Sequence, residues 1–406
     1  MKTLMKTLLK PLSLALFVAA TLPTQSAYIR TSPPANTIIP ATSSSPHFCK
    51  AIGGPASEEG KSLIQTSDGG YAIAGYTKSF GAGSEDVYVV KLDANGNLQW
   101  TKTIGGPESE EGNSLIQTSD GGYAIAGKTN SFGAGRWDVY VVKLDAKGNL
   151  QWTQTIGGPG PEIGYSLIQT SNGGYAIAGT TGSFGAGKAD VYVVKLDTNG
   201  NLQWTKTIGG PKDDWGSSLI QSSDGGYAIA GYTISFGAGG DDVYVVKLDA
   251  SGNLQWTKTI GGPDREEGNS LIQTSDGGYA IAGYTKSLGA GGRDVYVVKL
   301  DANGNLQWTK TIGAKNEYSS TSSLIQTSDG GYAIAGHTKS FGAGGDDVYV
   351  VKLDKNGDAC CAVSQTSQVG SGGTLSSPTS SIGSGGTLTS PTPSTSSGGT
   401  LTTLCP

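Results

Sequence analysis

The chain contains 406 residues, of which 65 are glycine and only 15% are charged, a composition that indicates many short extended segments joined by tight turns. Its formal net charge is −5 and it has only four arginines. This balance argues against nucleic-acid binding, which needs a concentrated basic face.

The N-terminus has the pattern of an export signal. Its positive charges come from three lysines, Lys2, Lys6 and Lys10. The apolar run that follows, Leu12–Leu22, is too short to cross a bilayer. We predict a signal peptide over residues 1–27, cleaved after Ala27 or alternatively after Ala20, and then a Ser/Thr/Pro-rich linker over residues 28–46. The mature protein is expected to be secreted, at the cell surface or in the periplasm, without a membrane span.

An internal repeat of 52 residues fills the middle of the chain. Tryptophans recur at this spacing at Trp100, Trp152, Trp204, Trp256 and Trp308. The segment D-V-Y-V-V-K-L-D occurs six times, beginning at Asp86, Asp138, Asp190, Asp242, Asp294 and Asp347. Six units occupy residues 53–358, and a period of this length is typical of propellers and other repeat folds.

Each unit has the pattern of four β-strands. In the first unit they are expected at residues 62–67, 71–77, 86–93 and 97–104. Asp68-Gly69-Gly70 joins the first two strands and Asn95-Gly96 the last two, and both sequences favour the positive φ angles of tight hairpins. The tryptophan on the fourth strand is expected to pack at the outer rim of its unit.

Tandem four-stranded units predict an all-β fold, a six-bladed β-propeller over residues 47–361. Alanines alternate with Tyr71 and Ile73 on the second strand, so each blade should have a small face and a bulky face that nest between neighbours. The pattern S-D-G-G-Y-A-I-A-G-Y-T-K-S-F-G-A-G, followed by D-V-Y-V-V-K-L-D and N-G-N-L-Q-W, resembles the propeller repeats of secreted bacterial and archaeal proteins. That resemblance implies the fold and no particular activity.

The stretch L-D-A-N-G-N-L-Q-W is also similar to the tryptophan-docking repeat of quinoprotein dehydrogenases, although its turn is one residue shorter. This resemblance implies the alternative function, a propeller enzyme of the quinoprotein oxidoreductase type. The adjacent Cys360 and Cys361 would suit it, because a vicinal disulfide contacts the cofactor in some quinoproteins.

The two ends of the repeat region are complementary. Residues 47–53 (H-F-C-K-A-I-G) match the fourth-strand pattern with Phe48 at the tryptophan position, whereas the sixth unit has no fourth strand of its own. We predict that residues 47–53 complete the sixth blade and close the ring, which removes exposed sheet edges.

The cysteines fit this closure. There are four of them, Cys49, Cys360, Cys361 and Cys405. Cys49 would lie near the adjacent pair in a closed ring, so we expect a disulfide between Cys49 and one member of that pair. The other member can pair with Cys405, and free thiols are the alternative.

Antiparallel strands place the tight turns at one end of every blade and the longer loops at the other. The short-turn end is nearly identical among the units, whereas the long-loop end varies. Three aromatic residues of the varied end, Trp137, Tyr165 and Trp215, are predicted to form a binding patch for a glycan or a surface protein, with local packing as the alternative.

Most loops that lead into a first strand are acidic. Their carboxylates are Glu58, Glu59, Glu108, Glu110, Glu111, Asp213, Asp214, Asp264, Glu266 and Glu267. We expect a solvated acidic rim, because the spacing matches no calcium-binding loop. No metal site or cofactor is expected, since neither His47 nor His337 has a Cys or His at metal-ligand spacing.

Residues 362–406 carry no charge and repeat S-G-G-T-L every 13 residues, which predicts a flexible or O-glycosylated stalk. For the whole chain we expect a monomeric, non-enzymatic propeller that acts as a binding or structural scaffold. Near-identical units present similar side chains around the axis, whereas a propeller active site needs different groups from different blades.

Overall fold

The computed structural model describes residues 47–289, 292–313, 317–339 and 345–359, and the backbone of six short strands between Gln368 and Thr403. The predicted signal peptide and linker, and Cys360, Cys361 and Cys405, lie outside the described residues. No helix among the described residues is long and apolar enough to cross a membrane.

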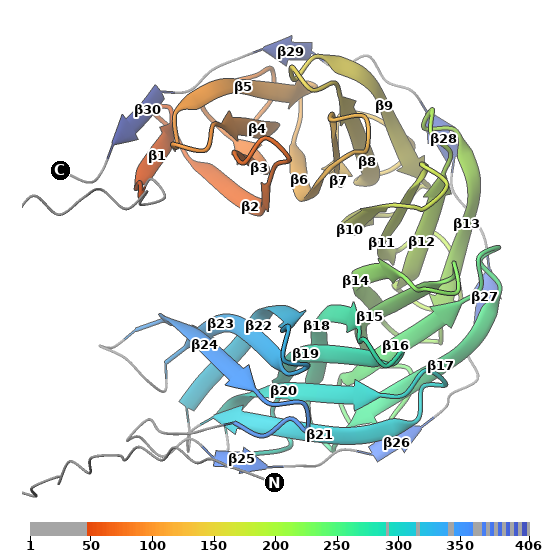
Figure 1. Ribbon diagram of the computed structural model, residues 1–406. Helices are drawn as coiled ribbons and strands as arrows, with labels where there is room; N and C mark the ends of the chain where they lie inside the picture. Colours follow the sequence, from red (N-terminus) through yellow and green to blue (C-terminus); the bar gives the residue numbers. More distant parts are fainter. Residues whose placement is uncertain are drawn as a thin grey trace, which may run out of the picture. The chain divides into compact units, whose positions relative to one another are not determined.

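The first blade is a four-stranded antiparallel meander (Figure 1). Its strands are β2 (Glu58–Gln65), β3 (Tyr71–Thr77), β4 (Asp86–Leu92) and β5 (Leu98–Gly105). Gly69 and Gly96, at φ 79° and 77°, form the two tight turns, as predicted. β2 begins at Glu58 rather than at Ser62, because Glu58 already pairs with Thr77.

The same arrangement recurs along the chain. The second blade contains β6 (Glu110–Gln117), β7 (Tyr123–Thr129), β8 (Asp138–Leu144) and β9 (Leu150–Gly157). The third contains β10 (Glu162–Gln169), β11 (Tyr175–Thr181), β12 (Asp190–Leu196) and β13 (Leu202–Gly209). The fourth contains β14 (Asp214–Gln221), β15 (Tyr227–Thr233), β16 (Asp242–Leu248) and β17 (Leu254–Gly261).

The last two blades differ in strand number. The fifth contains β18 (Glu266–Gln273), β19 (Tyr279–Thr285), β20 (Gly292–Leu300) and β21 (Leu306–Gly313). The sixth contains β22 (Glu317–Gln326), β23 (Tyr332–Thr338) and β24 (Asp347–Leu353). Six repeated sheets confirm the predicted fold, an all-β six-bladed propeller of four-stranded blades, and the sixth repeat supplies three strands, as expected.

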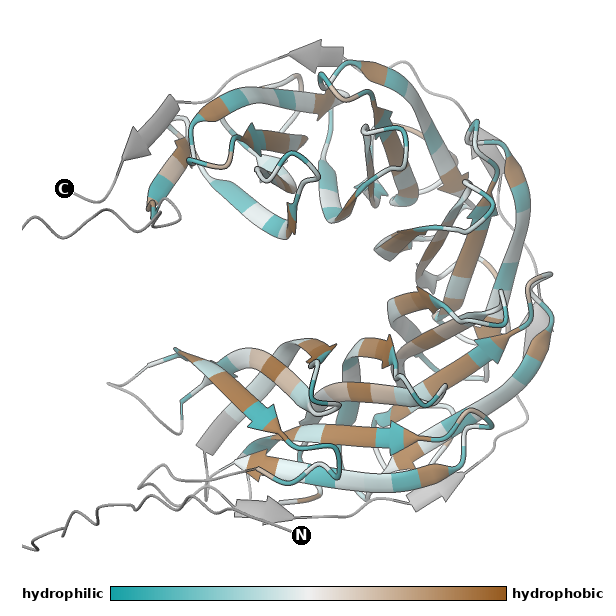
Figure 2. Ribbon diagram, viewed as in Figure 1, coloured by the Kyte–Doolittle hydropathy of each residue, from teal (hydrophilic) through white to brown (hydrophobic). Residues whose placement is uncertain are grey.

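Each blade interface combines a small face with a bulky face, as predicted. Ala72, Ala74 and Val89 of the first blade form one buried cluster with Leu115 and Tyr140 of the second. Equivalent clusters recur at the next three interfaces, and hydrophobic residues line the strands that meet there (Figure 2). Because one blade alone would leave such a face in water, stacking of blades supplies most of the apolar burial.

The recurrent tryptophan packs from the outer strand of its blade against the next blade, whereas the sequence predicted packing at the outer rim of its own unit. The ring of Trp100 lies 5.5 Å from that of Tyr123 in an edge-on arrangement. It also covers Gly148, where an added Cβ would lie 3.0 Å from the indole. Gly148 adopts φ 77°, so a glycine is required both by the turn and by the close approach of the ring.

The N-terminal segment stands where the fourth strand of a preceding blade would be. β1 (Lys50–Gly53) follows Phe48, whose ring lies 5.6 Å from Tyr71, edge-on, and covers Gly96. Trp100 has the same two neighbours one blade later. Phe48 therefore occupies the tryptophan position, as predicted.

Ring closure through β1 stays a prediction. Among the strand pairs of the described residues, β1 pairs with β30 (Thr400–Thr403), and β24 pairs along its length with β23. Cys49 is exposed and forms no disulfide within the described residues, so the predicted cross-link also stays a prediction. The residues proposed as its partners lie outside the described part of the chain.

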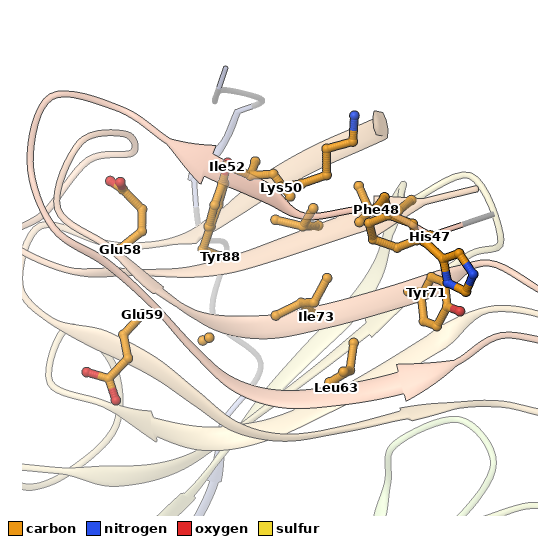
Figure 3. Close-up of a pocket in the computed structure, with 14 residues that line it drawn as sticks. His47, Phe48, Lys50, Ile52, Glu58, Glu59, Leu63, Tyr71, Ile73 and Tyr88 are labelled. Atoms are coloured by element: carbon orange, nitrogen blue, oxygen red, sulfur yellow. The ribbon is translucent and has the colours of Figure 1, made fainter. Parts of the chain in front are cut away.

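The first and last blades each leave an apolar face uncovered. Leu63 is 65% exposed and Val350 is 69% exposed, whereas their counterparts Leu115 and Val89 are buried. Figure 3 shows the face of the first blade, a cavity of about 630 Å³ lined by Phe48 and by residues of β1 to β4. The two uncovered faces carry the residue types that pack together at the internal interfaces.

The C-terminal tail contains six short strands, where the sequence predicted a flexible stalk. They are β25 (Gln368–Gly370), β26 (Thr374–Ser376), β27 (Ser381–Gly383), β28 (Thr387–Thr389), β29 (Ser394–Ser396) and β30. In this order they pair antiparallel with β21, β17, β13, β9, β5 and β1 (Figure 1). The first five of these partners are the outermost strands of their blades.

The register of the tail strands is constant. The residues that pair with the recurrent isoleucine of the outer strands are Val369, Leu375, Ile382, Leu388, Thr395 and Leu401. An outer strand presents a row of N–H and C=O groups, and pairing with them requires no hydrophobic core of the tail's own. Composition alone does not reveal this possibility.

Candidate binding site at the long-loop end

The repeats differ at a few positions on their two innermost strands. One varied position, early in the first strand, is occupied by Glu59, Glu111, Ile163, Trp215 and Glu267. These residues pair in turn with Tyr76, Lys128, Thr180, Tyr232 and Tyr284 of the second strand. Directly paired residues share one face of a sheet, so the two varied positions lie side by side in each blade. They lie on the two inner strands of the blades, whose arrangement Figure 1 shows.

Three aromatic rings form a continuous stack at this end. Tyr165 of β10 lies 5.7 Å from Trp215 of β14, with an angle of 28° between the ring planes. Trp215 lies 5.7 Å from Tyr232 of β15 at an angle of 13°. All three side chains are partly exposed, so solvent reaches the stack.

A cavity of about 480 Å³ adjoins the stack. Its other lining residues are Asn113, Ser217 and Glu267. Burial, with a contribution from the Glu111 carboxylate, raises the pKa of Tyr165 to about 12, so its hydroxyl is neutral and can donate and accept hydrogen bonds. The cavity therefore combines flat apolar surfaces with an amide, hydroxyl groups and a carboxylate.

The structure places the predicted residues in two groups. Tyr165 and Trp215 stack on each other. Trp137 belongs to a different group in the second blade, where the Lys128 ammonium lies 4.2 Å from the centre of its ring. Lys128 also forms an ion pair of 2.9 Å with Glu111, which is paired with Lys61 as well.

Sequence reasoning missed Tyr232, the third member of the stack. The residue lies inside a strand, at the position where other repeats have tyrosine, lysine, threonine or histidine. Variation at one position of a nearly invariant strand was the available signal. Its meaning becomes clear only from the register that pairs Tyr232 with Trp215.

Several acidic residues are structural, which corrects the prediction of a solvated rim. Glu110, Asp214 and Glu266 are fully buried. Glu110 accepts hydrogen bonds from the Gly106 N–H at 2.6 Å and from the Thr129 hydroxyl at 2.7 Å. These residues begin the first strands and hold the preceding loops. Among the described residues, no three His, Cys, Asp or Glu are grouped to hold a metal ion.

Comparison with known proteins agrees with the geometry. A family model described as outer membrane protein assembly factor BamB matches residues 50–220, a span that includes the first three blades. The chain is a β-propeller repeat protein. This propeller protein is also 29% identical over 187 residues to the regulatory protein FlaEY of Caulobacter vibrioides. That stretch is 39% of this chain and 20% of FlaEY, so the propeller protein spans about a fifth of its relative.

Solved structures similar to the propeller protein include Sqt1 from Chaetomium thermophilum. It is 12% identical with a TM-score of 0.39, over 79% of this chain and 89% of Sqt1. An endo-1,5-alpha-L-arabinanase from Thermotoga petrophila RKU-1 is 13% identical with a TM-score of 0.30, over 77% of this chain and 98% of the arabinanase.

Charged groups at the long-loop end of the propeller protein are engaged with neighbouring side chains. Burial acts to raise the pKa of Glu111, but hydrogen bonds from Lys61 and Lys128 hold that pKa below its usual value. The Arg293 guanidinium lies 3.6 Å from the centre of the Tyr284 ring. Chemically, the arrangement offers aromatic contact area and hydrogen-bonding groups.

Proposed function

We propose that this propeller protein is a non-enzymatic binding scaffold outside the cytoplasm, and that it binds a neutral glycan at the stack of Tyr165, Trp215 and Tyr232. The observation that carries the proposal is this partly exposed stack, built where the repeats depart from one another. Exposed aromatic rings provide large contact area at low conformational cost, and residues of this kind dominate binding sites.

The chemistry of the cavity supports a glycan. The faces of sugar rings carry C–H groups that pack on aromatic rings, and their hydroxyl groups need fixed donors and acceptors. Asn113, Ser217 and Glu267 provide such groups beside the stack. The carboxylates of Glu267, Asp241 and Asp213 all interact electrostatically with Tyr232, and this negative surrounding disfavours an acidic glycan.

The proposal of a non-enzymatic scaffold rests on the similarity of the repeats. Catalysis in a propeller needs different acids, bases or metals that converge at one point, with at least one pKa near the working pH. The Glu111 carboxylate at the long-loop end is paired with two lysines, which keeps it ionised and engaged. This pairing makes Glu111 unsuited to proton transfer.

The location outside the cytoplasm rests on the predicted signal peptide over residues 1–27. The match to a family described as an outer membrane protein assembly factor supports a place in the cell envelope. Cell fractionation tests it, with the mature protein expected in the periplasm, at the surface or in the medium. Recovery of the uncleaved chain in the cytoplasm would contradict it.

The binding site is tested on a glycan array with the mature protein. We expect binding to neutral glycans, and the Trp215→Ala variant should bind at least about tenfold more weakly, equivalent to about 1.4 kcal/mol. Tyr232→Ala should weaken binding as well, and Tyr76→Ala is its matched control, because Tyr76 occupies the position of Tyr232 in a blade outside the stack. Equal binding by Trp215→Ala and the parent protein would contradict the site.

Two further measurements test the rest of the proposal. Size-exclusion chromatography with light scattering should show a monomer. Addition of pyrroloquinoline quinone with calcium should give neither cofactor absorbance nor dye reduction, whereas either signal would favour the quinoprotein alternative. If the protein binds a surface protein but no glycan, the proposed role as a binding scaffold remains and the proposed glycan ligand is wrong.

A further inference from the structure

Each blade has a lysine at its short-turn end, buried in the first five blades and exposed in the sixth, and it is paired with an aspartate of the neighbouring turn except in the third blade. The five ion pairs, all between 2.8 and 3.0 Å long, are Lys91–Asp68, Lys143–Asp120, Lys247–Asp224, Lys299–Asp276 and Lys352–Asp329. In the third blade the aspartate is replaced by Asn172, and the lysine is Lys195.

Lys195 is therefore a buried cation without a carboxylate partner of this kind. It is 4% exposed, and its ammonium donates a hydrogen bond to the Leu196 carbonyl at 2.7 Å. The nearby Asp197 is engaged elsewhere, since it accepts hydrogen bonds from the N–H groups of Asn199 and Asn201 in its own turn. Burial lowers the pKa of Lys195, and the charge of Asp197 opposes this shift only in part. A buried charge that has lost its partner is costly, and an anion from solution can replace the partner.

The orientation of Asn172 adds a second donor. Its Oδ1 accepts hydrogen bonds from the Thr170 hydroxyl at 2.6 Å and from the Gly174 N–H at 3.3 Å. Because a backbone N–H can only donate, the amide oxygen must face Gly174. The amide nitrogen of Asn172 is then the counterpart of Oδ2 of Asp224, which in the fourth blade accepts a hydrogen bond from Lys247 at 2.8 Å.

The two donors line a cavity of about 450 Å³. Its wall also contains Trp204, Tyr227, Gln203 and Asp197, whose carboxylate is held by its own turn. Asn172 is exposed, so the cavity can be reached from solvent. A carboxylate has two oxygens in one plane, which matches the aspartate side chain that the other blades use for the same purpose.

We propose that Lys195 and Asn172 form a binding site for a small carboxylate, whose oxygens accept hydrogen bonds from the ammonium and the amide nitrogen. The ligand supplies the negative charge that the aspartate supplies in the other blades. The cavity beside it accommodates the remainder of a small carboxylic acid.

The experiment is titration of the full-length protein with acetate, followed by calorimetry and by line broadening of ¹³C-labelled acetate. We expect one bound acetate per chain in the parent protein and none in Asn172→Asp, because the new side chain supplies its own carboxylate. Asn172→Asp should also raise the melting temperature, and acetate should no longer change it.

The converse variant lies in a neighbouring blade. Asp224→Asn should create a second acetate site, because it reproduces in the fourth blade the pair of donors that the third blade has. Its melting temperature should fall and be restored by acetate. Where this variant does not fold, the comparison of Asn172→Asp with the parent protein decides the matter.

Three results would overturn the proposal. They are absence of acetate binding to the parent protein, undiminished binding to Asn172→Asp, and equal binding of chloride or phosphate in competition with acetate. The last result would show a site for anions in general rather than for a carboxylate.

Discussion

The two ends of the blades differ in what their residues contact. At the short-turn end, Trp256 covers Gly304 of the next blade, and the Ser223 N–H donates to Gln273 of the next blade at 2.8 Å. At the long-loop end, the varied residues of the inner strands face a partly exposed surface. Packing between blades requires the same residue types at the short-turn end of every repeat. The varied residues of the long-loop end are free to differ, because no such packing constrains them. In a chain of near copies, departure from the repeat marks where binding can evolve.

The largest effect on stability is expected from the predicted disulfide that would close the ring of blades at the short-turn end. If β1 completes the sixth blade, Cys49 should be linked to Cys360 or Cys361 in the exported protein. A loop of about 310 residues closed in this way would stabilise the protein by about 4–5 kcal/mol in the chain-entropy model. Peptide mapping without reduction should find the linked peptide, and urea unfolding with and without reductant measures its effect. An unlinked Cys49 would contradict this closure.

The next largest effect on the free energy of unfolding is expected from the recurrent tryptophans. We expect Trp256→Ala to lower the free energy of unfolding by about 3 kcal/mol, because it removes the edge-on contact with Tyr279 and leaves a cavity against Gly304. Urea unfolding measures the change. Trp256→Phe is the matched control and should lose less, since Phe48 fills the equivalent place before the first blade. If Trp256→Ala is as stable as the parent protein, Trp256 does not have the structural role assigned to it.

Acidic residues at the two ends should respond to pH in opposite directions. At the long-loop end, burial, with the Glu162 charge adding to it, raises the pKa of Asp138 to about 6. At the short-turn end, hydrogen bonds from Thr66 and Lys91 hold the pKa of Asp68 at about 2. Stability from Asp138 is complete below its unfolded pKa and is lost as the pH rises through about 6. Stability from Asp68 is complete above its unfolded pKa and is lost as the pH falls through about 2.

We therefore expect the free energy of unfolding to be greatest near about pH 4, the unfolded pKa of an aspartate, and to fall by about 2 kcal/mol towards pH 7. Urea unfolding at a series of pH values measures this profile. Glu162→Gln keeps a hydrogen-bond acceptor for Gly158 but removes the charge beside Asp138, so it should flatten the decrease. A free energy that rises steadily from pH 4 to pH 7 would contradict the assignment.

The smallest effect is expected at the aromatic stack. Tyr165→Ala should change the free energy of unfolding by less than about 1 kcal/mol, because the side chain is partly exposed, while it weakens glycan binding. Urea unfolding and the glycan array measure the two quantities on the same sample. A loss of stability as large as that of Trp256→Ala would identify the stack as packing, and the contrast between the two ends would fail.

Local patterns account for the parts of the fold that the sequence predicted. The turns at Gly69 and Gly96 and the packing of Trp100 depend on residues within one repeat or on the next copy of it. Tyr232 could not be found in this way, because its meaning depends on cross-strand register. The burial of Glu110 was missed for a related reason, since a charged residue beside a loop resembles a solvated one until its hydrogen-bond donors are placed around it.

The tail strands link the length of the C-terminal region to the number of blades. One 13-residue period of the tail supplies two strands, and successive strands pair with the outer edges of successive blades. A gene duplication that added one 52-residue repeat would therefore leave one sheet edge open unless the tail also grew by about half a period. Two segments of very different composition must evolve in step, and a family of such chains should show tail length rising with repeat number.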